Sequence, residues 1–176
     1  MPDKAQTIGH AIVGRVLAVN IGERARRYRP AVRILDVEDR RTNERVTIQI
    51  DAEDRQFVVP LSPGDYLLNR VQIAEGPFMS MAEMAIPFSV GQGPVNYVGT
   101  WRFGIGSPGY GRMVAVSIVF DQQEKAQTLD FLHKEYPVLA RQSVEDVRVE
   151  PASESVRLFE VMPYPRIHRY FRRHWW

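Results

Sequence analysis

The sequence predicts a mainly β protein: an antiparallel β-sandwich of seven or eight strands, followed by one C-terminal helix and an additional tail. Short apolar runs separated by turn residues fill the chain from Ile8 to Phe120, and a single segment of helical periodicity follows. The length of 176 residues, with 44% hydrophobic and 25% charged residues, suits one globular domain with an extra segment. We therefore place the sandwich at residues 8–142 and a connection with a basic aromatic tail at 143–176.

Three strands are predicted in the first part of the chain, over residues 8–19, 32–37 and 46–50. Gly9 and Gly14 lie within the first of them and indicate a β-bulge or a close approach of two backbones. In the third run, apolar residues alternate with Thr47 and Gln49, which is the period of a half-buried strand.

A hairpin is predicted next, because residues 57–61 and 66–73 are β-prone and the turn residues 62–65 (Ser-Pro-Gly-Asp) separate them. The following segment, 76–85, contains three methionines and no clear period. We interpret it as a loop over the end of a sheet in which methionine fills gaps. The alternative is a partner-binding surface that uses the flexibility of methionine.

Further strands are predicted at residues 86–90 and 95–105, and the clearest of all at 113–120, where apolar residues alternate. The glycine spacing of residues 104–109 matches a dinucleotide-binding loop, but such a loop must open a helix and this one leads into a strand. We therefore expect residues 104–109 to form a hairpin loop.

The closing helix is predicted over residues 121–136. Asp121, with Glu124 three residues later, forms the pattern of a capping box, and Pro137 ends the helix. The residues at helical spacing that would pack on a sheet are Ala126, Leu129, Leu132 and Tyr136.

The residue inventory favours no catalytic chemistry, and we predict no catalytic residue, metal ligand or cofactor. The chain has no cysteine, and its four histidines have no metal-ligand spacing. The carboxylate pairs Asp36/Glu38 and Asp51/Glu53 alternate along strands and would share a face. Because arginines lie nearby, we interpret these pairs as a solvated, charge-balanced rim and not as a general acid and base.

Positive charge is concentrated in the tail. From Arg157 to Trp176 there are five arginines and one glutamate, a net charge of +4. The rest of the chain has a net charge of −2, which gives the total of +2. As a helix, the tail would gather aromatic residues on one side and arginines on the remainder. The candidate binding residues are Arg166, Arg169, Tyr170, Phe171, Arg172, Arg173, Trp175 and Trp176.

Four interpretations of the tail stay open. Its aromatic residues can dock on the protein's own sheet, or the tail can contact an anionic membrane or protein. Single-stranded nucleic acid is less favoured, because the body of the protein is slightly acidic. The fourth interpretation is an unstructured end.

The order of motifs resembles a group of uncharacterised bacterial envelope lipoproteins. The resemblance rests on residues 11–16 (AIVGRV), 57–66 (FVVPLSPGDY), 86–90 (IPFSV) and 98–101 (VGTW), and it spans roughly residues 8–140. It implies a sandwich of the prealbumin-like, carboxypeptidase-regulatory-like or Ig-like type and a location in the cell envelope or periplasm. Members of the group usually carry a signal peptide and a lipid-bearing cysteine, and neither is found in this chain, so a cytoplasmic location stays open.

Our first functional hypothesis is therefore a non-enzymatic binding or structural module of the cell envelope, acting through loops, a strand edge or the tail. The second is a carbohydrate- or small-molecule-binding domain with Tyr97, Trp101, Phe103 and Tyr110 as a stacking platform. Alternation places Tyr97, Trp101 and Phe103 on one face of a strand, where we expect them to belong to the core. The partner and the oligomeric state do not follow from the sequence.

Overall fold

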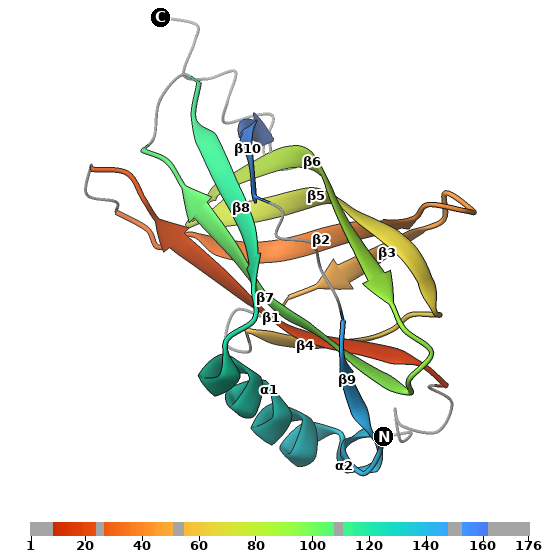
Figure 1. The fold of residues 1–176 in the computed structure, drawn as a ribbon. Helices are drawn as coiled ribbons and strands as arrows, with labels where there is room; N and C mark the ends of the chain where they lie inside the picture. Colours follow the sequence, from red (N-terminus) through yellow and green to blue (C-terminus); the bar gives the residue numbers. More distant parts are fainter. Residues whose placement is uncertain (1–8, 24–26, 51–54, 108–110, 148–152, 162–176) are drawn as a thin grey trace, which may run out of the picture.

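Two β-sheets pack against each other in the computed structural model, which describes residues 9–23, 27–50, 55–107, 111–147 and 153–161 (Figure 1). Sheet A has the strand order β10 (Ser153–Arg157), β8 (Met113–Val119), β7 (Val95–Ile105), β1 (Ala11–Asn20) and β4 (Gln56–Pro60), and β9 (Val144–Asp146) also pairs with β7. Sheet B has the order β11 (Phe159–Val161), β6 (Phe78–Val90), β5 (Gly64–Glu75), β2 (Ala31–Asp39) and β3 (Arg45–Gln49). The helices are α1 (Gln122–Glu135) and α2 (Pro137–Ala140).

The prediction of a mainly β protein with two packed sheets is confirmed, but two of its details differ. The described residues form eleven strands, eight of them before α1, where seven or eight were predicted in all. Sheet A is also mixed, because β1 runs parallel to β7, and β7 runs parallel to β9. Parallel pairing needs a long connection between the strands, and the chain from β1 to β7 supplies it by passing through sheet B.

Residues 57–73 do not form the predicted hairpin. β4 pairs with β1 in sheet A, whereas β5 pairs with β2 and β6 in sheet B, so residues 61–63 carry the chain from one sheet to the other. Leu61 is buried, and the hydroxyl of Tyr66 donates a hydrogen bond of 2.8 Å to the carbonyl oxygen of Ser62. Turn residues predict a reversal of direction, but they do not specify whether the returning strand joins the same sheet.

The methionine-rich segment is strand and not loop, since β6 begins at Phe78. Along β6, residues from Ser80 to Val90 alternate between buried and less buried positions. Met84 lies in the core, whereas Met79 and Met81 face away from it and are partly buried. The prediction missed the strand because methionine and alanine have weak β-propensity, although the alternation is present in the sequence.

A β-bulge in β7 reverses which side chains face the core. Val13 pairs with Tyr97 and Arg15 with Thr100, so β7 contains one more residue than β1 between these pairs. Gly99, with a φ of 79°, lies in the extra step. The expected close backbone approach at Gly14 is confirmed, because a Cβ there would lie 3.1 Å from the carbonyl oxygen of Gly99.

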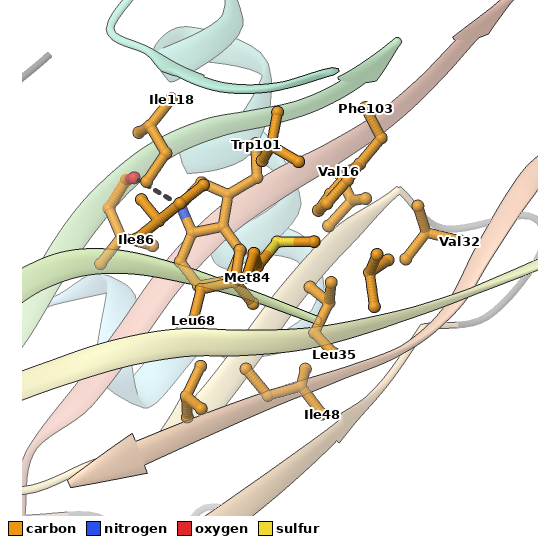
Figure 2. Packing of buried hydrophobic residues seen from close by; sticks show 14 of the residues in the cluster. Val16, Val32, Leu35, Ile48, Leu68, Met84, Ile86, Trp101, Phe103 and Ile118 are labelled. Atoms are coloured by element: carbon orange, nitrogen blue, oxygen red, sulfur yellow. Dashed lines mark hydrogen bonds between the residues drawn. The ribbon is translucent and has the colours of Figure 1, made fainter. Parts of the chain in front are cut away.

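The main core lies between the two sheets and is centred on Trp101, which is fully buried (Figure 2). Its ring centroid lies 5.3 Å from that of Phe57 in β4 and 5.5 Å from that of Phe88 in β6, so it contacts both sheets. The indole nitrogen donates a hydrogen bond of 3.0 Å to the carbonyl oxygen of Val98, which leaves the buried polar group satisfied.

A second, smaller core lies between α1 and the outer face of sheet A. Leu132 of α1 and Leu139 of α2 pack there with residues of β1 and β7, among them Tyr97. Of the predicted helix face, Leu132 is buried, Leu129 and Tyr136 are partly buried, and Ala126 is exposed. The helix therefore covers sheet A with a narrow apolar stripe.

The predicted helix is confirmed, and its N-terminal cap is half of a capping box. Asp121 accepts hydrogen bonds from the backbone N–H groups of Gln123 and Glu124. Glu124 does not reach back to Asp121, because its carboxylate accepts a hydrogen bond from Arg102 on β7 at 2.9 Å.

For residues 143–155 the sequence predicts a short strand or an extended connection, and it gives residues 156–176 no place in the sandwich. The described residues 144–147 and 153–161 contribute strands to both sheets. β9 pairs with β7, β10 extends sheet A beside β8, and β11 extends sheet B beside β6. Between β10 and β11, the buried Leu158 marks the point where the chain passes from one sheet to the other. The sequence pattern thus allows a short strand before residue 156, but it does not predict β11 or the sheets that these strands join.

Candidate binding surface

Exposed aromatic residues gather where the β1–β2 connection, the β5–β6 hairpin and the start of β11 meet. We call this region the aromatic end and define it by Tyr28, Phe78 and Phe159, together with the partly exposed Met79 and Met81. Tyr28 is 37% exposed, Phe78 51% and Phe159 54%. Large apolar side chains with this exposure are candidates for contact with a partner.

The strand register brings these residues together. Phe159 pairs with Met81, and Val161 pairs with Met79, so β11 lies along the first residues of β6. The ring of Tyr28 lies against Gly76 in the β5–β6 turn, where an added Cβ would approach the ring to 2.6 Å. Gly76 has a φ of 59°, so glycine is favoured there both by the backbone conformation and by the ring.

Of the three exposed rings that define the aromatic end, two lie within cation–π distance of an arginine. The guanidinium carbon of Arg27 lies 5.6 Å from the ring centroid of Tyr28, and that of Arg157 lies 5.1 Å from the ring centroid of Phe159. A guanidinium group stacked on a ring keeps its charge and its outward N–H groups while its flat face is covered. The aromatic end therefore presents apolar surface and positive charge side by side.

A half-buried arginine holds the neighbouring loops in place. The guanidinium of Arg112 forms an ion pair with Glu75 and also donates a hydrogen bond of 3.2 Å to the carbonyl oxygen of Gly106. The backbone carbonyl of Arg112 accepts a hydrogen bond of 2.8 Å from the N–H of Leu158. Burial lowers the pKa of Arg112, and the charge of Glu160 opposes this change. These contacts join β5, β8 and the β10–β11 junction.

The eight predicted binding residues of the tail, Arg166 to Trp176, lie outside the described residues. In sequence, the segment that holds these eight residues follows Val161, the last residue of β11, which pairs with Met79. The tail is thus attached to the chain at the aromatic end. It repeats the composition of that region, with arginine next to aromatic residues.

The residues of the proposed stacking platform do not form an exposed surface. Tyr97, Trp101 and Phe103 are at most 1% exposed, and Tyr110 lies outside the described residues. The core interpretation is confirmed, but the shared face is wrong, because Tyr97 packs under α1 while Trp101 and Phe103 pack between the sheets. The bulge at Gly99 causes this difference.

The acidic pair Asp36/Glu38 is not a solvated rim. Asp36 is 2% exposed, forms an ion pair with Arg70 and accepts a hydrogen bond of 2.7 Å from the hydroxyl of Thr47. Glu38 accepts hydrogen bonds from Arg45 at 2.7 Å and from Asn69 at 2.8 Å. Asp51 and Glu53 lie outside the described residues. Each described carboxylate is bound by basic or polar side chains on the outer face of sheet B, an arrangement that ties neighbouring strands together.

A polar layer connects α1 to sheet A. Arg15 donates a hydrogen bond of 2.5 Å to Gln127, and Arg102 forms an ion pair with Glu124. Burial raises the pKa of Tyr97, whose hydroxyl has no hydrogen-bond partner among the described residues. These contacts position the helix on the sheet.

The described residues contain no candidate metal site and no candidate membrane-spanning helix. Among the described residues, no three acidic or histidine side chains are placed so that they could hold a metal ion. Neither of the described helices has the length and apolar character needed to cross a membrane.

No protein-family model, no curated protein and no solved structure matches this chain.

Proposed function

We propose that this protein is a non-enzymatic binding module that attaches to an anionic membrane surface through its aromatic end and its tail. The observation that carries the proposal is the pair of arginine–aromatic contacts, Arg27 with Tyr28 and Arg157 with Phe159, beside the strand from which the tail continues. The cell envelope as location, and a prealbumin-like or Ig-like type of sandwich, belong to the same proposal and draw on the sequence resemblance.

The chemistry of this surface suits a lipid headgroup layer. Aromatic rings are favoured at the level of the headgroups, where one part of the side chain is in an apolar environment and another contacts water. Guanidinium groups bind phosphate oxygens with two hydrogen bonds, and each basic residue near an anionic leaflet contributes about 1 kcal/mol. The tail adds four arginines and two tryptophans over residues 166–176. The aromatic rings provide apolar insertion and the arginines provide electrostatic attraction, so the surface combines both contributions to membrane binding.

Co-sedimentation of the full chain with vesicles tests the proposal. We expect binding to vesicles that contain phosphatidylserine and little binding to vesicles of phosphatidylcholine alone. Replacing two adjacent tail arginines, Arg172→Gln with Arg173→Gln, removes about 2 kcal/mol and weakens binding about thirtyfold.

The matched control replaces the adjacent pair Arg40 and Arg41 by glutamine, which removes the same charge at the opposite end of β2. This control should bind the vesicles almost as the unchanged chain does. A second variant, Tyr28→Ser with Phe159→Ser, should weaken binding while all arginines remain. If the tail variant and the control variant lose vesicle binding equally, the interaction depends only on net charge, and the proposal is contradicted. Equal binding to both kinds of vesicle would contradict it as well.

A further inference from the structure

On one side of the two-sheet fold, two strand edges have main-chain groups that pair with no other described strand. The hydrogen bonds from Val16 N–H to the carbonyl of Arg55 and from Leu61 N–H to that of His10 fix the pairing phase between β1 and β4. Because alternate residues of an antiparallel strand bond to one side, Gln56 and Val58 direct their N–H and C=O groups away from β1. The edge of β4 thus offers two donors and two acceptors from these residues.

The edge of β3 follows the same rule. Hydrogen bonds from Asp39 N–H to the carbonyl of Glu44 and from Ile50 N–H to that of Arg33 fix its phase with β2. Thr47 and Gln49 therefore direct their main-chain groups away from β2. Sheet A ends at β4 and sheet B ends at β3 on the same side of the molecule (Figure 1).

A groove of about 260 Å³ lies between these two edges. The residues of β3 and β4 form two of its walls. Phe131 of α1 and Tyr136, which caps the end of α1, line it as well, with ring centroids 6.1 Å apart. Every residue that lines the groove is uncharged, although a quarter of the chain is charged. The β4 edge also lacks the charged side chains that usually prevent strand addition, and its one proline, Pro60, limits such addition only at the last residue of the strand.

We propose that this groove binds an extended, uncharged peptide segment of a partner protein, which adds as a strand to the edge of β4. The unpaired donors and acceptors on β4 are complementary to another β-strand and to no other regular structure. Phe131 and Tyr136 would contact the side chains of that peptide on one face. A charged peptide would be excluded, because the lining offers no opposite charge to a group that loses its water.

The size of the edge favours a peptide over a second copy of this chain. β4 has five residues and is about 17 Å long. A stable dimer buries about 1,600 Å² in total, which needs a much larger surface than one short edge. Strand addition of a peptide needs only a few main-chain hydrogen bonds and side-chain contacts. The described lining of the groove includes no residue of the aromatic end, so this inference is independent of the membrane proposal.

A matched pair of substitutions at Gln56 tests the inference. Gln56→Pro removes the outward N–H while the ladder to β1 keeps all its bonds, and proline is tolerated at this kind of edge position. Gln56→Ala removes the same side chain and keeps the N–H. The probe is an acetylated and amidated ten-residue peptide of alternating threonine and valine, added to the full chain.

Binding is measured by fluorescence anisotropy of the labelled peptide and by hydrogen exchange of the protein. We expect the peptide to slow exchange at the amides of Gln56 and Val58. Gln56→Pro should weaken binding about tenfold or more and Gln56→Ala less than twofold. Phe131→Ala, which keeps the edge intact, should also weaken it. A version of the peptide with lysine in place of threonine should bind at least tenfold more weakly.

Three results would overturn the inference. They are unchanged exchange at Gln56 and Val58 at millimolar peptide, equal binding of the proline and alanine variants, and a dimer of the unchanged chain that Gln56→Pro abolishes. The last result would assign the edge to a second copy of this chain. Thermal unfolding of both Gln56 variants checks whether they are folded. If the proline variant is not folded, Phe131→Ala tests the inference instead.

Discussion

Tyr97 and Trp101 lie four residues apart on β7 but pack on opposite faces of sheet A. In a regular strand, residues separated by an even number of positions share a face. Gly99 changes this relationship, because the bulge adds one residue to β7 relative to β1. One glycine thus allows a single strand to supply Tyr97 to the core under α1 and Trp101 to the core between the sheets.

Replacing Gly99 with alanine should therefore cost more than its small change in volume. The left-handed φ of 79° costs a non-glycine residue about 1–2 kcal/mol, and the new Cβ would lie 2.8 Å from the carbonyl oxygen of Val119. We expect a loss of about 2–4 kcal/mol in the free energy of unfolding, measured with chemical denaturant. Gly111→Ala is the control, because its φ is 73° but nothing lies within 4 Å of the added Cβ. Equal losses at the two positions would show that the contact with Val119 has no effect.

The buried ion pair on sheet B should respond more strongly than its exposed neighbour. Asp36 is 2% exposed, so Arg70→Met leaves a buried carboxylate with Thr47 as its remaining partner. We expect this change to cost about 3–5 kcal/mol. Arg45→Met removes the same kind of partner from Glu38, but the Arg45 side chain is 63% exposed, and the cost should stay below about 1 kcal/mol. Chemical unfolding of both variants measures the difference, and similar costs would contradict the interpretation of Asp36 as a buried charge.

The cap of α1 provides a third test. Asp121 accepts hydrogen bonds of 2.9 and 3.0 Å from the first backbone N–H groups of the helix, so Asp121→Ala should cost about 1 kcal/mol. Asp130, exposed in the same helix, carries the same charge, and Asp130→Ala should change the stability by less than about 0.5 kcal/mol. Thermal unfolding of both variants provides the comparison. If the two variants melt at the same temperature, the cap contributes nothing.

The sequence predicts the elements of this fold better than their arrangement. The alternation in residues 46–50 and 113–120 and the cap at Asp121 depend on local preferences, so strands and helix appear where expected. The turn at residues 62–65 shows the limit, because turn residues specify a reversal but not the sheet that the next strand joins. The face of Tyr97 depends on one bulge, and its position is set by pairing with β1. Non-local pairing of this kind leaves little trace in a single sequence.

The candidate surfaces show the same limit in another form. The arginine and aromatic residues of the tail were recognisable from composition alone, since five arginines in residues 157–176 are unusual. Each of the contacts Arg27–Tyr28 and Arg157–Phe159 is local in sequence. That the two pairs lie at the same end of the fold was not predictable, because it depends on the packing of Tyr28 on Gly76 and the pairing of β11 with β6. The groove beside β4 is not predictable either, because an edge strand is defined by the neighbour that it lacks.

Two buried tyrosines should respond in opposite ways to loss of the hydroxyl group. The hydroxyl of Tyr97 is buried without a hydrogen-bond partner, whereas that of Tyr66 donates to the carbonyl oxygen of Ser62 at 2.8 Å. At neutral pH, Tyr97→Phe should leave the stability unchanged or raise it, because an unsatisfied polar group leaves the core. Tyr66→Phe should cost about 1 kcal/mol for the lost hydrogen bond.

The dependence of stability on pH provides an independent test of the burial of Tyr97 and Tyr66. Burial raises the pKa of Tyr97 above its usual value of 10.0. The hydroxyl therefore ionises in the unfolded chain before it ionises in the folded protein, and stability falls as the pH rises above about 10. Tyr97→Phe should make this alkaline loss smaller, as measured by chemical unfolding between pH 8 and about 11. Burial also raises the pKa of Tyr66. The loss of stability at alkaline pH that remains in Tyr97→Phe should therefore decrease further when Tyr66→Phe is added. An unchanged alkaline slope in Tyr97→Phe would mean that water reaches this hydroxyl between α1 and sheet A.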